Sequence, residues 1–318
     1  DVVFGLSREL ELRGHAVEII LPKYDCMRLD QVWGLHGIDH DLWVPWDGGA
    51  IRCTVWFGFV HGRKCFFIEP HCAQAFFDRG TYYGFWDDPE RFAFFSKAAL
   101  EFLAKSNKRP DVIHTHDWQT ALVPVLLYEL YAHAGLADQR VCHTIHNFRH
   151  QGTTGPGILR ATGLNRPEYF GAPDRMGDEF DRHSINLLRG AILYSNAVTT
   201  VSPHHAWEAR HTDLGFGLGH ALHLHQDKFV GILNGLDYEM WNPETDSHIP
   251  QHYGVATFAD KAGNKRALRQ RMLLRDGVRP IIGYVGRLDT QKGLHLIRHA
   301  LFHALEHDAQ HATQRFGR

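Results

Sequence analysis

The loop that follows the last apolar run of the chain carries two cations at a spacing suited to a diphosphate. Residues 280–285 are apolar enough for a buried strand, and Arg287 and Lys292 follow in a loop bounded by Gly286 and Gly293. In α/β sheets the carboxyl ends of strands open toward the ligand crevice, so both cations could reach one anionic leaving group. The loop therefore indicates nucleotide chemistry. On this motif alone, a polar loop with two solvated cations is the alternative.

Composition favours a small anionic ligand over a polymer of phosphates. The chain has 318 residues, which suggests about two domains. Its 34 Lys and Arg residues are balanced by 36 Asp and Glu residues. There is no overall charge to attract nucleic acid or an anionic membrane, so phosphate recognition must be local. We expect neither a nucleic-acid partner nor a membrane partner.

Hydropathy and cysteine spacing favour a reduced, soluble protein. No stretch approaches the roughly twenty apolar residues of a membrane span, and residues 1–15 show no targeting signal. We expect a cytoplasmic protein, or a plastid one if the source is a plant. The cysteines are odd in number and lack Cys-x-x-Cys spacing, which argues against a disulfide framework or a structural zinc site. They are expected to be reduced core thiols: Cys26, Cys53, Cys65, Cys72 and Cys142.

The 25 histidines raise the alternative of a metal-dependent hydrolase. One candidate group is His114, His116 and Asp117, which lacks the further histidine that a binuclear site would need. The other is the cluster at positions 220, 223 and 225, whose only nearby carboxylate is Asp227. Neither spacing is a good metal site, and we expect no metal cofactor.

The pattern of apolar residues predicts alternating strands and helices over the first 240 residues. Apolar positions 3, 6 and 10 predict an opening helix. A hairpin is expected around the turn at 61–63. Alternation of this kind predicts an α/β fold with a parallel, doubly wound sheet, and a helix with no strand before it suggests that the first strand of the sheet is absent. Strands are predicted at 16–22, 53–59, 64–68, 110–116, 140–146, 197–202 and 229–233, and helices at 90–103, 118–131 and 187–194.

A second, smaller domain is predicted after a hinge at residues 241–250. The first domain would span 1–240, and the second 251–318, with helices at 263–275 and 293–306 around a strand at 281–285. Residues 311–318 do not look like a strand. About sixty residues cannot close a Rossmann-type domain, because one or two strands leave an apolar face uncovered. We therefore expect this second domain to be incomplete.

Short strings at the carboxyl ends of the predicted strands give a family resemblance. From Asp1 to about Gln310 the sequence resembles the bacterial glycogen synthases and plant starch synthases, which are retaining glycosyltransferases of the GT-B architecture with two Rossmann-like domains. The order and spacing of the strings together make the resemblance specific. They lie at 116–119, 144–147, 200–203, 217–219, 233–237, 241–243, 286–288 and 291–293, and the helix start at 1–3 matches as well.

The resemblance implies a reaction and assigns the donor site. It implies transfer of glucose from ADP-glucose to the nonreducing end of an α-1,4-glucan, by front-face substitution with retention and without a metal. Arg287 and Lys292 would bind the leaving diphosphate, for which a guanidinium fork and an ammonium point charge are suited. The preference for ADP over UDP rests on the resemblance alone.

Further roles are implied near the sugar. His146 would lie beside the transferred glucose, and Asn147 and Asn234 would hydrogen-bond the sugar or support that geometry. Asp1 and Tyr83 match donor-side positions, although Tyr83 could simply pack within an aromatic loop.

The acceptor side is assigned to two adjacent residues. By the resemblance, Asp117 is an acidic residue important for catalysis near the acceptor, and Trp118 is a wall of the cleft. Taken alone, an Asp-Trp pair is more typical of an ordinary helix start, with the carboxylate as cap.

Two departures from the family limit what the chain should do alone. The family's Lys-x-Gly-Gly loop, which would precede Asp1, and its Glu-containing loop after residue 310 are not in this sequence. We therefore expect a chain truncated at both ends relative to the family, and inactive or poorly folded in its second domain by itself. Two alternatives are a non-catalytic glucan-binding remnant and another GT-B transferase, such as a sucrose or trehalose-phosphate synthase relative.

Overall fold

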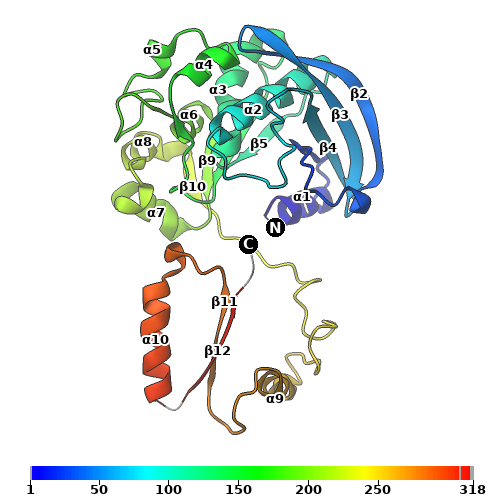
Figure 1. Cartoon of the computed structure of the whole chain (residues 1–318), viewed down its shortest axis with the longest axis vertical. Helices are drawn as coiled ribbons and strands as arrows, with labels where there is room; N and C mark the ends of the chain where they lie inside the picture. Colours follow the sequence, from blue (N-terminus) through cyan, green and yellow to red (C-terminus); the bar gives the residue numbers. More distant parts are fainter. Residues whose placement is uncertain (1, 308, 316–318) are drawn as a thin grey trace. The chain divides into compact units, whose positions relative to one another are not determined.

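The chain divides into two compact units. The computed structural model describes residues 2–307 and 309–315. The first unit is Asp1–Gly235 and the second is Leu236–Arg318, so the division falls a few residues before the predicted hinge at 241–250. Both units contain alternating strands and helices, and they depart from the prediction at the places given below (Figure 1). Each unit is described separately below.

The first unit contains a mixed four-stranded sheet with the order β1-β4-β3-β2. Strands β3 and β4 form the predicted antiparallel hairpin, while β1 pairs with β4 in parallel. Strand β2 was not predicted, and it forms a long antiparallel edge beside β3 (Figure 1). The strands are β1 (Glu18–Pro22), β2 (Trp33–Trp46), β3 (Gly49–Val60) and β4 (Arg63–Pro70).

The second sheet of this unit is parallel throughout and has the order β10-β9-β6-β5. Short buried strands separated by helices are what a doubly wound sheet requires, and the prediction of parallel pairing is confirmed here. Its four strands end toward the same edge, so the residues that follow them are brought together. The strands are β5 (Val112–His116), β6 (Arg140–Ile145), β9 (Ala197–Thr200) and β10 (Phe229–Gly231).

Helix α2 (Asp88–Lys105) joins the two sheets into one core. Its first turn carries acidic residues and a proline and its last turn carries Lys105, an arrangement that suits the helix dipole. One side contacts β2 and β4, and the other contacts α3 (Leu122–Leu126) and the turn η2 (Trp118–Thr120). Phe92, Phe94, Phe95 and Phe102 are all buried in this position.

Most of the remaining helices of the first unit cover the parallel sheet or connect its strands, while α1 contacts the hairpin of β3 and β4. The single helix predicted at 118–131 is instead a 3₁₀ turn, a short α-helix and a π-helical segment in succession. These helices are α1 (Val2–Leu12), α4 (Gly157–Thr162), α5 (Pro167–Phe170), α6 (Leu187–Tyr194), α7 (Pro203–His211) and α8 (Gly219–Leu224). The short turns are η1 (Leu29–Gln31), η3 (Leu127–Tyr131), η4 (Ala132–Ala134), η5 (Asp213–Gly215) and η6 (Gln226–Lys228), and a small ladder joins β7 (Thr153–Thr154) to β8 (Ile185–Asn186).

A groove separates the two sheets of the first unit. Among the described strands, β1 pairs only with β4 and β5 only with β6, so each sheet ends in an edge strand. Residues 17–22 of the first edge and His114, Thr115 and His116 of the second line one mainly apolar cavity of about 520 Å³, together with α1. Both sheets therefore present an edge to a common space.

The second unit is built on a two-stranded parallel sheet. Strand β11 (Ile281–Gly286) leads through η8 (Thr290–Lys292) and helix α10 (Leu294–Glu306) to strand β12 (Gln310–Arg315), which pairs with β11 in parallel. Helix α9 (Lys261–Arg271) and turn η7 (Phe258–Asp260) precede them. The prediction that residues 311–318 are not strand-like is wrong for 311–315: main-chain hydrogen bonds to β11 set this strand, and they do not require apolar side chains.

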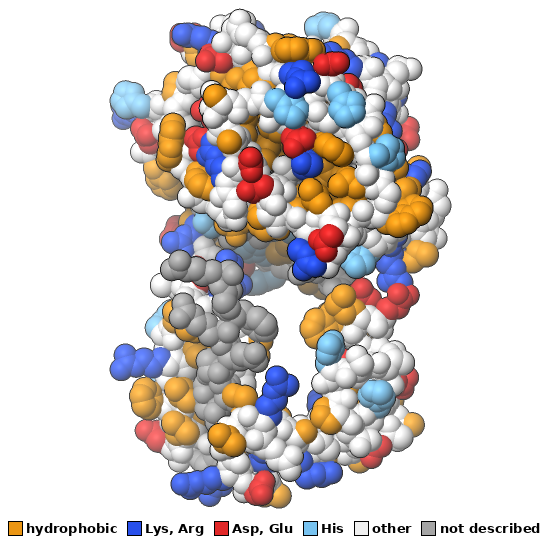
Figure 2. All heavy atoms as spheres, turned by 45° about the vertical axis from the view of Figure 1, so that its right-hand side comes forward, with side chains coloured by type: hydrophobic (Ala, Val, Ile, Leu, Met, Phe, Trp, Pro, Cys, Tyr) orange, Lys and Arg blue, Asp and Glu red, His pale blue; other side chains and the backbone are white. Residues whose placement is uncertain are grey.

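Surface and thiol features agree with the composition. On the face in Figure 2, Lys and Arg side chains lie among Asp and Glu side chains rather than in one patch. Over the described residues, no helix has the length and apolar character needed to cross a bilayer. All five cysteines are free in the structure; Cys53 and Cys65 are buried, and the other three are partly exposed.

The packing of α2 gives a direct stability test. Phe94 is fully buried and its ring lies 5.3 Å from the rings of both Trp46 and Phe76. Phe94→Ala should lower the free energy of unfolding by about 3 to 5 kcal/mol, measured by urea denaturation. Phe180 is 79% exposed, so Phe180→Ala should change the free energy of unfolding by less than about 0.5 kcal/mol. Equal effects of the two substitutions would contradict the packing described.

Candidate functional site

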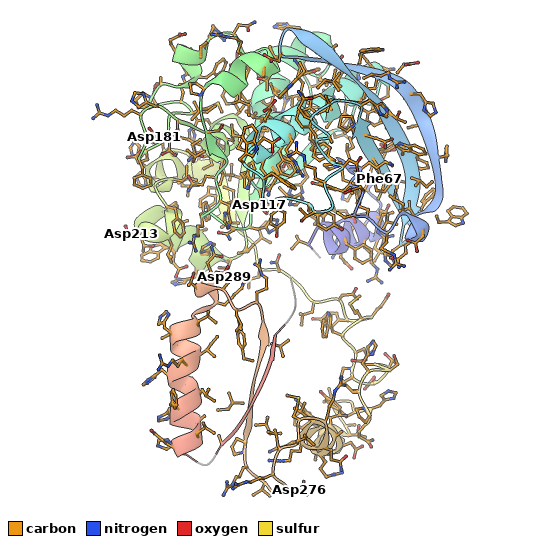
Figure 3. All side chains as sticks on the ribbon, in the orientation of Figure 1. Phe67, Asp117, Asp181, Asp213, Asp276 and Asp289 are labelled. Carbon is orange, nitrogen blue, oxygen red and sulfur yellow. The ribbon has the colours of Figure 1, made fainter. Side chains whose placement is uncertain are left out.

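The turn after β5 places Asp117 in a backbone conformation that an L-residue rarely adopts. Its φ is 55° and its ψ is −177°, a region occupied almost only by glycine. The turn persists because Asp117 N–H donates to the Thr144 carbonyl at 2.9 Å, across to strand β6. Strain of this kind costs free energy and is typical of functional sites. Figure 3 shows Asp117 within the first unit.

The Asp117 carboxylate holds the residue that follows β6. Its Oδ1 accepts the main-chain N–H of His146 at 2.7 Å, which ties the end of β5 to the end of β6. The carboxyl is half-buried, and burial raises its pKa, while the N–H groups of His146 and Asn147 oppose that rise. This is not the helix cap that an isolated Asp-Trp pair would suggest, because the side chain makes no capping bond to its own turn.

Two histidines from neighbouring strands face each other beside this carboxylate. His116 Nδ1 lies 3.1 Å from His146 Nε2, and the two rings stack at 5.4 Å with 18° between their planes. Burial, and then the nearby His114 and His146, lower the pKa of His116 to about 3. His116 is therefore neutral near pH 7, and it can hold His146 through one ring nitrogen.

A ladder of side-chain hydrogen bonds supports the histidines from beneath. His114 Nε2 lies 2.7 Å from Thr144 Oγ1, and Thr144 Oγ1 lies 2.7 Å from Thr199 Oγ1, so the contact runs across three strands. His143, fully buried, bonds Thr115 through Nδ1 at 2.7 Å. Burial lowers the pKa of His143 to about 3. Sequence reasoning considered His116 only as a candidate metal ligand and as part of a family string, and it missed these threonines as site residues. The available signal was alternation: His114 and His116 lie two positions apart, on one face of β5.

Trp118 and Tyr83 lie near the same strand end. Trp118 packs edge-on against Phe92 of α2 at 5.4 Å, and Gly152 lies close against its ring, where a Cβ atom would clash at 2.5 Å from Trp118 Cε3. Tyr83 is 60% exposed and lines the groove with His116. Its loop is held by the buried Arg91, which donates to the Tyr82 carbonyl at 2.6 Å.

The other site residues predicted in the first unit are Asn147, Asn234 and Asp1. Asn147 directly follows His146, and its Oδ1 accepts the Arg149 N–H at 3.0 Å. Asn234 is exposed three residues beyond β10, and within residues 2–307 and 309–315 no hydrogen bond joins it to the His116–His146 pair. Asp1 lies outside the described residues.

The cationic loop of the second unit is organised by its own hydrogen bonds. Asp289 accepts the Gln291 N–H at 2.9 Å, Tyr284 Oη donates to the Arg287 carbonyl at 2.8 Å, and Gly293 turns the chain with φ 69° into α10. Figure 3 marks Asp289 in this loop. Arg287 and Lys292 are exposed, and neither has an ion-pair partner in the described part of the chain. Both charges are free to meet an anion.

The histidine groups weighed as metal sites are not assembled as such. His114 and His116 are engaged by Thr144 and His146. Over the described residues, three potential ligand groups come together at one place only, at His303, Glu306 and His307 of α10. That cluster was not recognised from the sequence.

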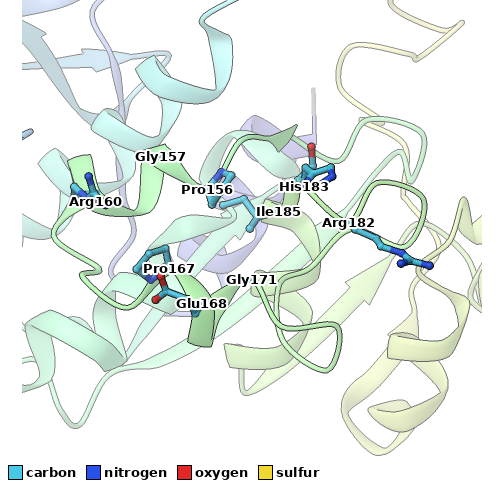
Figure 4. A pocket seen from close by; sticks show the side chains of 10 residues that line it. Pro156, Gly157, Arg160, Pro167, Glu168, Gly171, Arg182, His183 and Ile185 are labelled. Carbon is cyan, nitrogen blue, oxygen red and sulfur yellow. The ribbon is translucent and has the colours of Figure 1, made fainter.

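A separate cavity of about 430 Å³ lies among the loops around α4 and α5 (Figure 4). Arg160, Glu168, Arg182 and His183 give it a mixed-charge lining. It contains none of the residues predicted for the site.

The fold and the strand-end residues define a class of protein. Two α/β units, with polar groups at the carboxyl ends of parallel strands and free cations after a strand in the second, are the organisation of a GT-B glycosyltransferase. The structure is similar to a solved catalytic domain of starch synthase IV from Arabidopsis thaliana bound to ADP and acarbose. The TM-score is 0.92 at 45% sequence identity, over 99% of this chain and 64% of that one.

Sequence comparisons give the family. Residues 1–224 match the family model for the starch synthase catalytic domain. The chain is 63% identical over 302 residues to a glycogen synthase 1 of Synechococcus sp. strain JA-2-3B'a(2-13), covering 95% of this chain and 62% of the relative. It is 46% identical to a probable starch synthase 4 of Arabidopsis thaliana, over 95% of this chain and 29% of that protein. The chain belongs to the starch synthase catalytic-domain family, and it spans about three-fifths of the length of the glycogen synthases it matches.

The strain at Asp117 can be measured by comparing two substitutions. Asp117→Ala and Asp117→Gly both remove the carboxylate that accepts the His146 N–H, but only glycine relieves a φ of 55°. Asp117→Ala should therefore be less stable than Asp117→Gly by about 1 to 3 kcal/mol in urea denaturation. Indistinguishable free energies of unfolding would show that the turn stores no strain.

The neutral histidines predict acid sensitivity. The pKa of His116 is about 3 in the folded chain and roughly 6.5 when unfolded, so the unfolded state binds the extra proton. The contribution of neutral His116 to the free energy of unfolding is complete above about pH 6.5. It is lost as the pH falls toward 3, by at most about 1.4 kcal/mol per pH unit for one such group. Unfolding by urea at about pH 7 and about pH 5 measures this loss.

The matched variants are His116→Asn and His183→Asn. The first removes a histidine whose pKa is lowered by burial, while the second replaces an exposed one. The loss of stability between the two pH values should be smaller in His116→Asn and unchanged in His183→Asn. An unchanged loss in His116→Asn would exclude His116 as a source.

Proposed function

We propose that this chain carries the chemistry of a glucosyltransferase that moves glucose from ADP-glucose to the nonreducing end of an α-1,4-glucan. The observation that carries the proposal is the pair Arg287 and Lys292, exposed after β11 with no ion-pair partner in the described residues. Family membership supports the reaction class. The 45% identical starch synthase IV domain, whose structure contains ADP and acarbose, supports a nucleotide-sugar donor and a glucan-like acceptor.

The proposed role of the cations follows from the charge that develops on the leaving group. As the bond between the anomeric carbon and the diphosphate oxygen breaks, negative charge grows on the diphosphate. A guanidinium fork and an ammonium group stabilise it electrostatically without a metal ion. Tyr284 Oη bonds the Arg287 carbonyl, and the Lys292 N–H donates to the Asp289 carbonyl at 2.9 Å, so the backbone of both cations is held in advance and little reorganisation is needed.

The proposed reaction retains configuration. A double displacement needs two carboxyl groups about 5 Å apart, whereas the group at the ends of β5 and β6 is built around one carboxylate, that of Asp117. In front-face substitution the acceptor hydroxyl attacks on the side from which the diphosphate leaves, and its proton passes to the leaving oxygen. His146 and Asn147 would lie beside the sugar, with Asn234, Tyr83 and Asp1 on the donor side, and Asp117 and Trp118 toward the acceptor.

The cations can be tested by binding. Arg287→Ala should weaken ADP binding to the 318-residue chain by roughly tenfold to a hundredfold, because a hydrogen bond to a charged group contributes about 1.5 to 3 kcal/mol. Arg287→Lys should weaken ADP binding less than Arg287→Ala does, since lysine keeps the charge but loses the guanidinium fork. Isothermal titration with ADP and ADP-glucose measures both. Arg266 is an exposed cation of α9, and Arg266→Ala is the control.

The choice of donor and acceptor is tested separately. Tighter binding of ADP-glucose than of UDP-glucose, together with cosedimentation with glycogen, would support the proposal. Undiminished ADP binding in Arg287→Ala and Lys292→Ala would overturn the assigned role of these residues. Incorporation of labelled glucose into glycogen at the rate of an intact synthase would support the function, and it would contradict the expectation that this chain is inactive alone.

A further inference from the structure

Helix α10 carries four histidines on one face. His295, His299, His303 and His307 are each four residues apart and all exposed. Residues separated by four positions are neighbours on a helix surface, so the rings form a continuous stripe. The last two come closest, with ring centroids 4.1 Å apart. This stripe has no part in the proposed glucosyl transfer.

The last turn adds a carboxylate to the stripe. One ligand atom from each of His303, Glu306 and His307 lies within 4.8 Å of the others, and all three side chains are exposed. A tetrahedral zinc ion with bonds of about 2.1 Å needs ligand atoms about 3.4 Å apart. Exposed side chains can close that difference by small rotations. Two histidines and one glutamate also form a recognised zinc ligand set, which leaves the fourth position to water.

Hydrogen bonding prepares one ring for coordination. His307 Nδ1 lies 2.8 Å from the His303 carbonyl, which can only accept, so Nδ1 carries the proton. The lone pair of His307 is then on Nε2, and the same bond orients the ring. The cluster also lies at the carboxyl end of a 13-residue helix, where the helix dipole favours a cation.

We propose that His303, Glu306 and His307 form a surface site for a divalent transition-metal ion such as Zn²⁺. Mixed imidazole and carboxylate ligands suit zinc better than Mg²⁺ or Ca²⁺, which prefer oxygen ligands throughout. The bound ion joins the last two turns of α10, so binding and helix formation are coupled. The proposal is independent of the glucosyl transfer.

The test uses the untagged 318-residue chain, freed of metal by a chelator and then dialysed. Isothermal titration with Zn²⁺ should give one dominant binding event, with an increase in helical circular dichroism. His303→Ala and His307→Ala should each weaken it at least tenfold, and Glu306→Gln should weaken it less. His295→Ala is the matched control, since it removes a histidine from the same face two turns earlier, and it should leave affinity unchanged.

Two outcomes would overturn the proposal. One is no Zn²⁺ binding by the parent chain while circular dichroism shows it folded. The other is an equal loss of affinity in His295→Ala and His303→Ala, which would spread binding over the stripe rather than place it at the last turn. Because all four positions are exposed, the variants should keep the parent's circular dichroism without metal, which separates lost ligands from lost structure.

Discussion

One strained turn organises the strand ends of the first unit. Asp117 can hold the His146 N–H only because its own backbone departs from the ordinary regions, and its N–H bonds the Thr144 carbonyl in return. These two bonds lock the end of β5 to the end of β6. The contact between His116 and His146, and the threonine ladder beneath it, depend on the register that the lock fixes. A change at this one residue therefore loosens the strand ends beside which the polar cluster lies.

Much of this arrangement could be predicted from the sequence, since strand ends in a parallel sheet converge. Asp117 and His146 were each expected at the carboxyl end of a predicted strand, and the structure brings them within hydrogen-bond distance. The pairing of His116 with His146 could not be predicted. It joins residues thirty positions apart, and it depends on ring orientation rather than on residue type. Whether Arg287 and Lys292 bind a nucleotide is likewise a matter of ligand geometry that no pattern contains.

The fold was predictable where apolar periodicity was strong and was missed at sheet edges. Strand β2 contains glycines and a proline and alternates charged with apolar residues, which weakens the strand signal while suiting an edge. Strand β12 is polar, and its pairing with β11 is decided by main-chain bonds after a helical crossover. In both cases tertiary context outweighs the preferences of the individual residues.

The groove between β1 and β5 has a consequence for hydration. An edge strand presents N–H and C=O groups that need partners, and those of β1 and β5 face one mainly apolar cavity of about 520 Å³. Water that enters this cavity is therefore expected along its two edges rather than in the apolar space between them. His114 and His116 line the same cavity. Because burial is the main cause of the lowered pKa of His116, that low pKa depends on the space remaining apolar.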